Sequence, residues 1–209
     1  SSSAASDVYK RHPRGPVHKH LQVGLSGGSI RYDKFPYPLG NVRGLIEMND
    51  DAWTFRNLTA ANDTGTVTCR GHLVPCPEGH ELVLRFTGSK IPLREELRDA
   101  LGPSNMRQLW NDLKLQGVVD LPEVVMRHRT GDPFPEIRVV AEPVGQTTSI
   151  EPVWLPYRLE NVSGTFEYGE GRVRIGQFRA EHDRTRLSAA VDCRFLADGR
   201  WTLHAEQIW

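Results

Sequence analysis

The sequence of 209 residues predicts a mainly β fold of the α+β type: a curved antiparallel sheet with one helical insertion. Three observations predict it: two similar segments 120 residues apart, apolar and polar residues that alternate along many segments, and frequent turn residues. The 19 glycines and 14 prolines are typical of turn-rich β-proteins, and the 38% of apolar residues is too high for a disordered chain.

The repeat is seen when residues 36–60 are aligned with residues 156–180. Eight of 25 positions are identical without a gap, where chance gives roughly one or two. Residues 7–15 match residues 123–131 at an offset of 116, which predicts about four extra loop residues around Asp132–Pro135. The sequence therefore predicts tandem repeats of about 116–120 residues that form a sheet groove.

The offsets divide the chain into leading residues 1–6, a first repeat over residues 7–122 and a second over residues 123–209. The first repeat contains the helical insertion, and the second contains strands only. The chain begins without Met, and its last residues still have the pattern of a strand. We therefore expect it to be an internal section of a longer array, which ends before the helix of its second repeat.

Strands are predicted where apolar and polar residues alternate with period two, as Val67, Cys69 and Leu73 do with their neighbours. The segments that fit are 21–25, 42–48, 53–60, 66–73 and 81–87, then 162–168, 172–180, 185–195 and 200–207. Turns are expected at Gly27-Gly28 and at residues 49–51, 61–65 and 75–79.

The alternation breaks at the same place in both copies. Phe55 and Leu58 are three residues apart, and so are Ile175 and Phe178. A shared slip of one residue predicts a β-bulge, which bends a sheet at a fixed point. We therefore expect the sheet to be curved.

The helical insertion is predicted over about residues 92–113, with Pro92 in the first turn. Leu93, Leu97 and Leu101 share one face at helical spacing, and Ser104 can cap a second short helix. That helix has Met106, Leu109, Trp110 and Leu113 as its apolar side chains. We expect the apolar stripe to be buried against the apolar face of the sheet.

One face of the predicted sheet is apolar and needs a covering, which could be the helix, lipid tails or an ordinary closed core. A buried CH₂ group of a lipid tail contributes about 0.8 kcal/mol. The candidate lining residues are Ile46, Met48, Trp53, Phe55, Val67, Leu82, Leu84 and Phe86 in the first repeat, and Phe166, Tyr168, Val173, Ile175, Leu187, Val191 and Leu203 in the second.

Cys69, His72, Cys76 and His80 form the one group of residues with metal-ligand spacing. Against a zinc site, residues three apart on a strand point to opposite faces, and the second repeat has only Cys193 in this region. A Cys69–Cys76 disulfide would need an oxidising compartment. Free thiols remain the leading interpretation, and we expect no metal and no cofactor.

The charges do not indicate nucleic acid as a partner, because 26 basic and 26 acidic residues give a net charge of zero. No nucleophile elbow, zinc-protease, phosphate-loop or dinucleotide motif is present in the sequence. We therefore expect a protein that is not an enzyme and has no catalytic residues.

Three segments carry a resemblance to a known family: residues 155–164 (LPYRLENVSG), residues 176–182 (GQFRAEH), and Ile91-Pro92-Leu93 with the helix that follows. With these segments, the chain resembles the AsmA-like family of bacterial envelope proteins, to which TamB-like bridge lipid-transfer proteins also belong. The resemblance covers the chain from about residue 21 onward. The helix departs from the family's all-strand grooves.

The resemblance implies a long β-groove of stacked repeats, anchored in the inner membrane and projecting into the periplasm. Its apolar interior would hold phospholipid acyl chains between the inner and outer membranes and so serve outer-membrane lipid homeostasis. Its partners would be these acyl chains and neighbouring repeats of the same chain. Two alternatives remain open: a structural or adhesive β-repeat module that binds proteins at the cell surface, and an enzyme that uses the Cys/His group.

Overall fold

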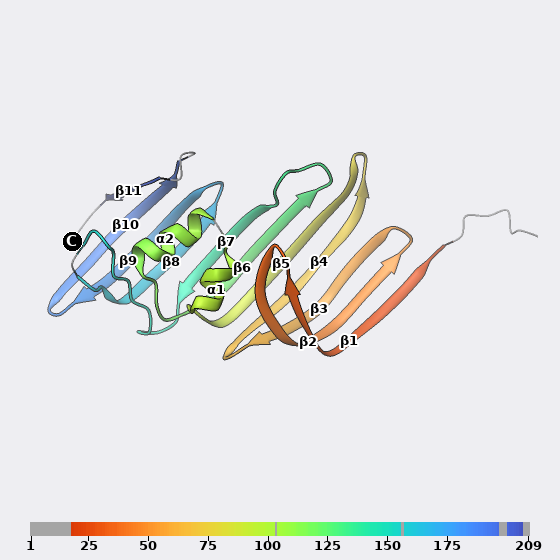
Figure 1. Ribbon diagram of the computed structural model, residues 1–209, viewed down its shortest axis with the longest axis horizontal. Coiled ribbons are helices and arrows are strands. Elements are labelled where there is room, and N and C mark those ends of the chain that lie inside the picture. The colour runs from red at the N-terminus through yellow and green to blue at the C-terminus, as the bar shows by residue number, and fades with distance from the viewer. Residues whose placement is uncertain (1–17, 103, 156, 197–199, 207–209) are drawn as a thin grey trace, which may run out of the picture.

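The eleven strands of the described residues form one antiparallel sheet, in which each strand pairs with the next along the chain (Figure 1). The computed structural model describes residues 18–102, 104–155, 157–196 and 200–206. The strands are β1 His20–Tyr32, β2 Phe35–Asn49, β3 Ala52–Asn62, β4 Gly65–Cys76, β5 Gly79–Pro92, β6 Val118–Arg129, β7 Glu136–Pro143, β8 Glu160–Gly169, β9 Arg172–His182, β10 Thr185–Phe195 and β11 Trp201–Glu206. The prediction of a mainly antiparallel β fold is confirmed.

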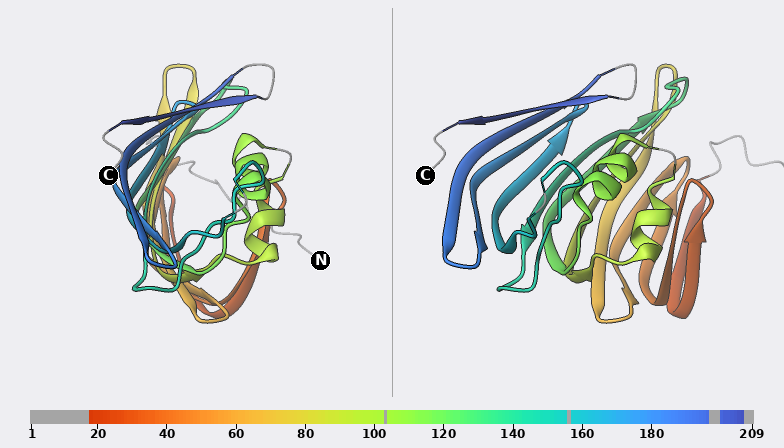
Figure 2. Two further views of the ribbon diagram at one scale, coloured as in Figure 1. Left: turned by 90° about the vertical axis from the view of Figure 1, so that its left-hand side faces the viewer. Right: turned by 60° about the vertical axis from the view of Figure 1, so that its left-hand side comes forward.

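The sheet is a single curved layer, and two short helices lie on its concave side (Figure 2). These are α1 (Glu95–Ala100) and α2 (Asn105–Leu113), both in the connection between β5 and β6. The loop between β7 and β8, residues 144–159, lies on the same side (Figure 2). No helix within the described ranges has the length or the apolar content needed to cross a membrane.

Short turns with left-handed residues join the neighbouring strands. Asp50 and Asp63 have φ of 53° and 50°, a conformation that aspartate tolerates better than most residues. The turns predicted at residues 49–51, 61–65 and 75–79 are confirmed. The turn predicted at Gly27-Gly28 is wrong, because β1 continues to Tyr32 through register shifts against β2.

Strands β6 and β7 were not assigned from the sequence. The predicted repeat boundary between residues 122 and 123 falls inside β6, which pairs along most of its length with β5. The loop predicted around Asp132–Pro135 is confirmed, since it joins β6 to β7. Residues 1–6 and the matched segment 7–15 lie outside the described residues.

The two predicted bulges are confirmed. The pairing of β3 with β4 shifts between Phe55 and Leu58, and the pairing of β9 with β10 shifts where Ile175 and Phe178 face Val191 and Ala189. The backbone also has left-handed residues at positions 120 apart: Asn41 and Asn161, Asp50 and Glu170, Asn57 and Gln177, Asp63 and Asp183. Strands β3 and β9 both contain 11 residues.

The helical insertion, residues 93–117, differs from the prediction at its start. Pro92 is the last residue of β5 and pairs with Val118, so it does not begin a helix. Leu93 N donates to Gly117 O at 2.8 Å, and this bond closes the base of the insertion. Ser104 caps α2 as predicted, because its side chain accepts a hydrogen bond from Arg107 N at 3.3 Å.

Candidate functional site: the apolar concave face

The concave face of the sheet is apolar from β1 to β11. Register places directly paired residues on the same face of a sheet, and side chains alternate between faces along each strand. One such row runs through Leu21, Met48, Trp53, Leu73 and Leu82 on β1 to β5. A second row runs through Tyr168, Val173, Cys193 and Leu203 on β8 to β11. Leu109 of α2 packs against Val173 and Cys193, which identifies this face as the one under the helices.

The structure places all fifteen predicted lining residues on this concave face. Their environments differ along the sheet, however. In β2 to β5 all eight are partly buried. In β8 to β10, Val173 is buried, and the other five predicted residues pack around buried clusters. Leu203, on the last strand, is 49% exposed.

Helix α2 covers one end of the β8–β11 face. Its buried Leu109 forms a cluster with Val173 and Cys193, and Met106 and Leu113 of the helix pack around it. The indole N–H of Trp201 donates to Asp112 Oδ2 at 2.9 Å, which ties the helix to β11. Apolar side chains on one face of a short helix thus close part of the concave face.

The β7–β8 loop covers the other end of the same strands. Ile150 and Leu155 of the loop pack against a cluster of buried residues: Leu159, Val162, Phe178, Ala180 and Ala189. The loop also bonds to the end of α2, since Glu151 N and Val153 N donate to the carbonyls of Leu113 and Asp112 at 2.8 and 2.9 Å. These carbonyls at the helix C-terminus lack partners within the helix. We call this covered part, β8–β11, the closed half.

The concave face of β1 to β7 is less covered, and we call it the open half. Leu21, Val23 and Ile137 are 43%, 37% and 39% exposed. Between them lie partly buried apolar side chains, which include Leu84 and Met126 in one paired row. Both buried clusters described above are made by the closed half and its cover. The open half is therefore an apolar surface on which a ligand could be placed.

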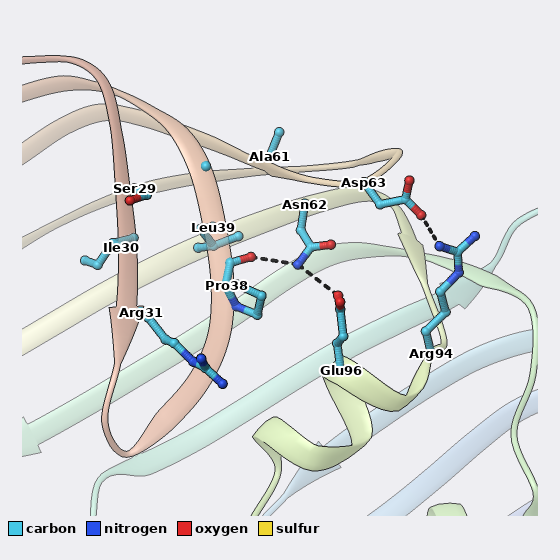
Figure 3. Close-up of a pocket in the computed structure, with 11 residues that line it drawn as sticks. Ser29, Ile30, Arg31, Pro38, Leu39, Ala61, Asn62, Asp63, Arg94 and Glu96 are labelled. Atoms are coloured by element: carbon cyan, nitrogen blue, oxygen red, sulfur yellow. Dashed lines mark hydrogen bonds and ion pairs between the residues drawn. The ribbon is translucent and has the colours of Figure 1, made fainter.

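Helix α1 lies over the edge of the open half and contacts β2 (Figure 2). A hollow of about 620 Å³ lies between this helix and the ends of β1 to β3, and Figure 3 shows residues that line it. The Asn62 amide nitrogen donates to Pro38 O at 2.7 Å and to Glu96 Oε2 at 3.4 Å, and Arg94 pairs with Asp63. These polar groups bond to one another, so they position α1.

Two buried polar atoms of the open half have no hydrogen-bond partner among the described residues. They are the Tyr37 hydroxyl and His128 Nδ1. Burial, with the nearby carboxylates of Glu96 and Asp63, raises the pKa of Tyr37 above its usual value of 10.0. The hydroxyl is therefore neutral at physiological pH and adds no charge to the apolar surface.

The Cys/His group does not form a site. Register places Cys69 and His80 on the concave face and His72 and Cys76 on the convex face. Across the described ranges, no three His, Cys, Asp or Glu side chains are grouped to hold a metal ion. These four residues therefore do not come together as a zinc site in the described structure.

The disulfide between Cys69 and Cys76 is also contradicted, because both thiols are free and the two residues lie on the same strand, β4. Seven residues of strand separate them by about 23 Å, far beyond the reach of a disulfide. Burial raises the pKa of the Cys69 thiol to about 11. Burial and the Asp192 carboxylate raise that of Cys193 to about 11 as well. Both thiols are thus poor nucleophiles at neutral pH.

The convex face is charged and largely paired with itself. Arg56 bonds to Glu47 at 2.9 Å, and Arg129 bonds to Glu81 at 2.8 Å. Exposed ion pairs of this kind contribute about 0–1 kcal/mol each. The two faces of the sheet therefore have opposite character, and the apolar one is the candidate functional surface.

Several lining residues were missed from the sequence. Val124 and Met126 on β6 and Ile137 and Val139 on β7 lie on the concave face by register. Both strands have the period-two pattern, but the match of residues 7–15 with residues 123–131 predicts a repeat boundary there instead.

Comparison with known proteins gave no match to a family model, to a curated protein or to a solved structure.

Proposed function

We propose that this chain is a section of an AsmA-like envelope protein, built from tandem repeats, whose concave face holds phospholipid acyl chains. The observation that carries the proposal is the apolar concave face that continues across the described strands and is only partly covered by the described chain over β1 to β7. The left-handed residues and bulges at positions 120 apart support the tandem repeats. Such an array would work in the periplasm, with its parent protein anchored in the inner membrane.

The chemistry of the open half favours acyl chains over a polar ligand. Leu84, Phe86 and Met126 present carbon and sulfur atoms, and the charged side chains of these strands lie on the opposite face. Each CH₂ group removed from water contributes about 0.8 kcal/mol, so one acyl chain of common length can offset the entropy lost on binding. The head group would remain in water beyond the strand ends.

The closed half limits where a lipid can lie. Its lining is occupied by Leu109, Ile150 and Leu155. The binding surface in this conformation is therefore the open half, and a lipid that passed along β8 to β11 would have to displace these side chains.

A binding titration with a matched pair of variants tests the proposal. A phosphatidylethanolamine with one fluorescent acyl chain should bind the full chain saturably, and Met126→Asp should weaken binding at least tenfold. Val125→Asp is the control, because the neighbouring Val125 pairs with Arg85 on the convex face. Circular dichroism would check that both variants fold. Absence of saturable binding, or equal loss in both variants, would contradict the proposal.

A second candidate function is a structural or adhesive β-module that binds proteins at the cell surface. The two ends of the sheet favour it: in the described part of the chain, β1 and β11 each pair on one side only. Strands with a free edge can pair with another chain. If this function holds, cross-linking should join edge strands of adjacent modules, and lipid binding should be absent.

A further inference from the structure

Helix α2 packs at a defined site on the closed half. Leu109 packs onto Val173 of β9 and Cys193 of β10, with Tyr168 and Ile175 beside them. Tyr168 pairs with Val173, and Val173 pairs with Cys193, so three of these side chains form one row across β8, β9 and β10.

The open half presents an equivalent row 120 residues earlier in the chain. Met48 pairs with Trp53, and Trp53 pairs with Leu73. Phe55 lies in the row beside this one, and Ile175 has the same position beside the later row. All four side chains are apolar and partly exposed. The described chain covers the later row with a helix but leaves the earlier row uncovered.

The backbone under the two rows also corresponds. The β-bulge lies after Phe55 in β3 and after Ile175 in β9, with a left-handed residue at Asn57 and at Gln177. The turns that precede the two strands contain left-handed Asp50 and Glu170. The two surfaces therefore have the bulge and the left-handed residues at the same positions relative to their apolar rows.

From this correspondence we infer that Met48, Trp53, Phe55 and Leu73 form a docking site for a short amphipathic helix. The helix would carry three apolar side chains spaced as Met106, Leu109 and Leu113 are in α2. Its occupant would be a partner's amphipathic helix with this apolar spacing, and not a second copy of this chain.

The corresponding polar contact extends the match. In the closed half, Trp201 donates to Asp112 of α2 and pairs with Phe195 on the neighbouring strand. Pro75 lies 120 residues before Phe195, and it pairs with His80. His80 is therefore the residue of the open half that corresponds to Trp201. His80 is exposed and lies on the concave face. A helix with an acid at the position of Asp112 would find a donor there too. The site is part of the open half, but its test is separate from that of lipid binding, because Met126 lies outside the site.

Methyl NMR of the full chain tests the inference, because the sequence has only three methionines. Met48 reports the docking site, Met106 reports α2 itself, and Met126 reports the open half outside the site. The probe is a synthetic peptide of residues 93–117, stapled between positions 107 and 111 on its polar face, since so short a helix is marginal in water. A peptide with Leu109→Asp is the matched control.

The expected result is a saturable shift of the Met48 methyl signal, with Met106 and Met126 unchanged. Leu73→Asp should abolish the shift, whereas Ile137→Asp, an exposed position on the same face, should leave it within twofold in affinity. A Met48 signal that does not move up to millimolar peptide would overturn the inference. So would an equal response to the control peptide, a response unaffected by Leu73→Asp, or a shift that follows protein concentration alone and so reports a second copy.

Discussion

The open half and the closed half of the sheet begin with similar side chains but end with different surroundings. Both present an apolar row on the concave face, Trp53 and Leu73 in one and Val173 and Cys193 in the other. Only the second row is covered, by α2, and the β7–β8 loop covers the neighbouring cluster around Phe178. The comparison shows that alternation along a strand determines which face is apolar, whereas the insertions between strands determine whether that face is a core or a surface.

The largest expected difference between the halves is in stability. Phe178 and Phe55 both lie on the concave face, but Phe178 is buried in the closed half and Phe55 is partly exposed in the open half. Phe178→Ala should lower the free energy of unfolding by about 3–5 kcal/mol, because it leaves a cavity among packed neighbours. Phe55→Ala should cost about half as much or less. Urea denaturation measures both, and equal losses would contradict the division into two halves.

The backbone bends should respond alike in both halves. Gly44 and Gly164 have φ of 136° and 128°, and an added Cβ would lie 2.7 Å from Asn57 O in the first case and 2.8 Å from Gly176 O in the second. Alanine at either position should cost about 1–3 kcal/mol. Gly176→Ala is the control, because its added Cβ has open space. Thermal unfolding that is sensitive to only one of the two positions would argue against equivalent bends.

A smaller effect concerns an ion pair in the closed half. The hydrogen bond from Arg172 holds the pKa of Asp192 below its usual value of 3.8, and Arg194 and Arg174 act in the same direction. The Arg172 Nε donates to Asp192 Oδ1 at 2.8 Å. A carboxyl group whose pKa is lower in the folded than in the unfolded state stabilises the fold when the pH is above the pKa of the unfolded state. This contribution is lost as the pH falls through the pKa of the folded state.

Asp192→Asn should therefore reduce stability at neutral pH, and the difference from the parent chain should disappear as the pH falls below 3.8. Arg172→Gln is the matched variant, and it should remove most of the same pH dependence. Denaturation at a series of pH values checks both. A difference that persists unchanged in acid would assign the effect to packing.

The smallest effect is on thiol reactivity. Burial raises the pKa of both Cys69 and Cys193, so alkylation near pH 8 should be slow at each. Cys193 should react more slowly than Cys69, because it is only 3% exposed beneath α2. Bound lipid should protect Cys69 further and leave Cys76, on the convex face, unchanged. Mass spectrometry of alkylated peptides measures the three rates, and protection of Cys76 would contradict lipid binding on the concave face.

The sequence predicted the sheet, its turns and its bulges well because these depend on local patterns. Residues 185–195 were predicted as a strand with the bounds that β10 has. The fifteen lining residues were placed on one face because side-chain alternation follows from the strand alone. Two local predictions were wrong. Gly27 and Gly28 continue strand β1 through register shifts and do not form a turn. Pro92 ends strand β5 and does not begin a helix.

Contacts between segments that are distant in the chain could not be predicted from the sequence. Leu109 lies 64 residues before Val173 in the chain, and no local pattern indicates that the helix after β5 covers β9 and β10. The β7–β8 loop presented the same difficulty, because Ile150 and Leu155 belong to no regular element. The sequence left the helix, lipid tails and a closed core open as coverings, and it did not indicate that α2 and the β7–β8 loop cover the second set of lining residues.

The central claim is that acyl chains bind the open half and not the closed half. The most direct measurement uses a phospholipid with a photoactivatable diazirine in one acyl chain, irradiated with the full chain, and mass spectrometry to locate the adducts. We predict adducts on concave residues of β3 to β6, among them Phe55, Leu84 and Met126, and few on β9 and β10. Adducts spread evenly over both halves, or concentrated on the convex face, would contradict this.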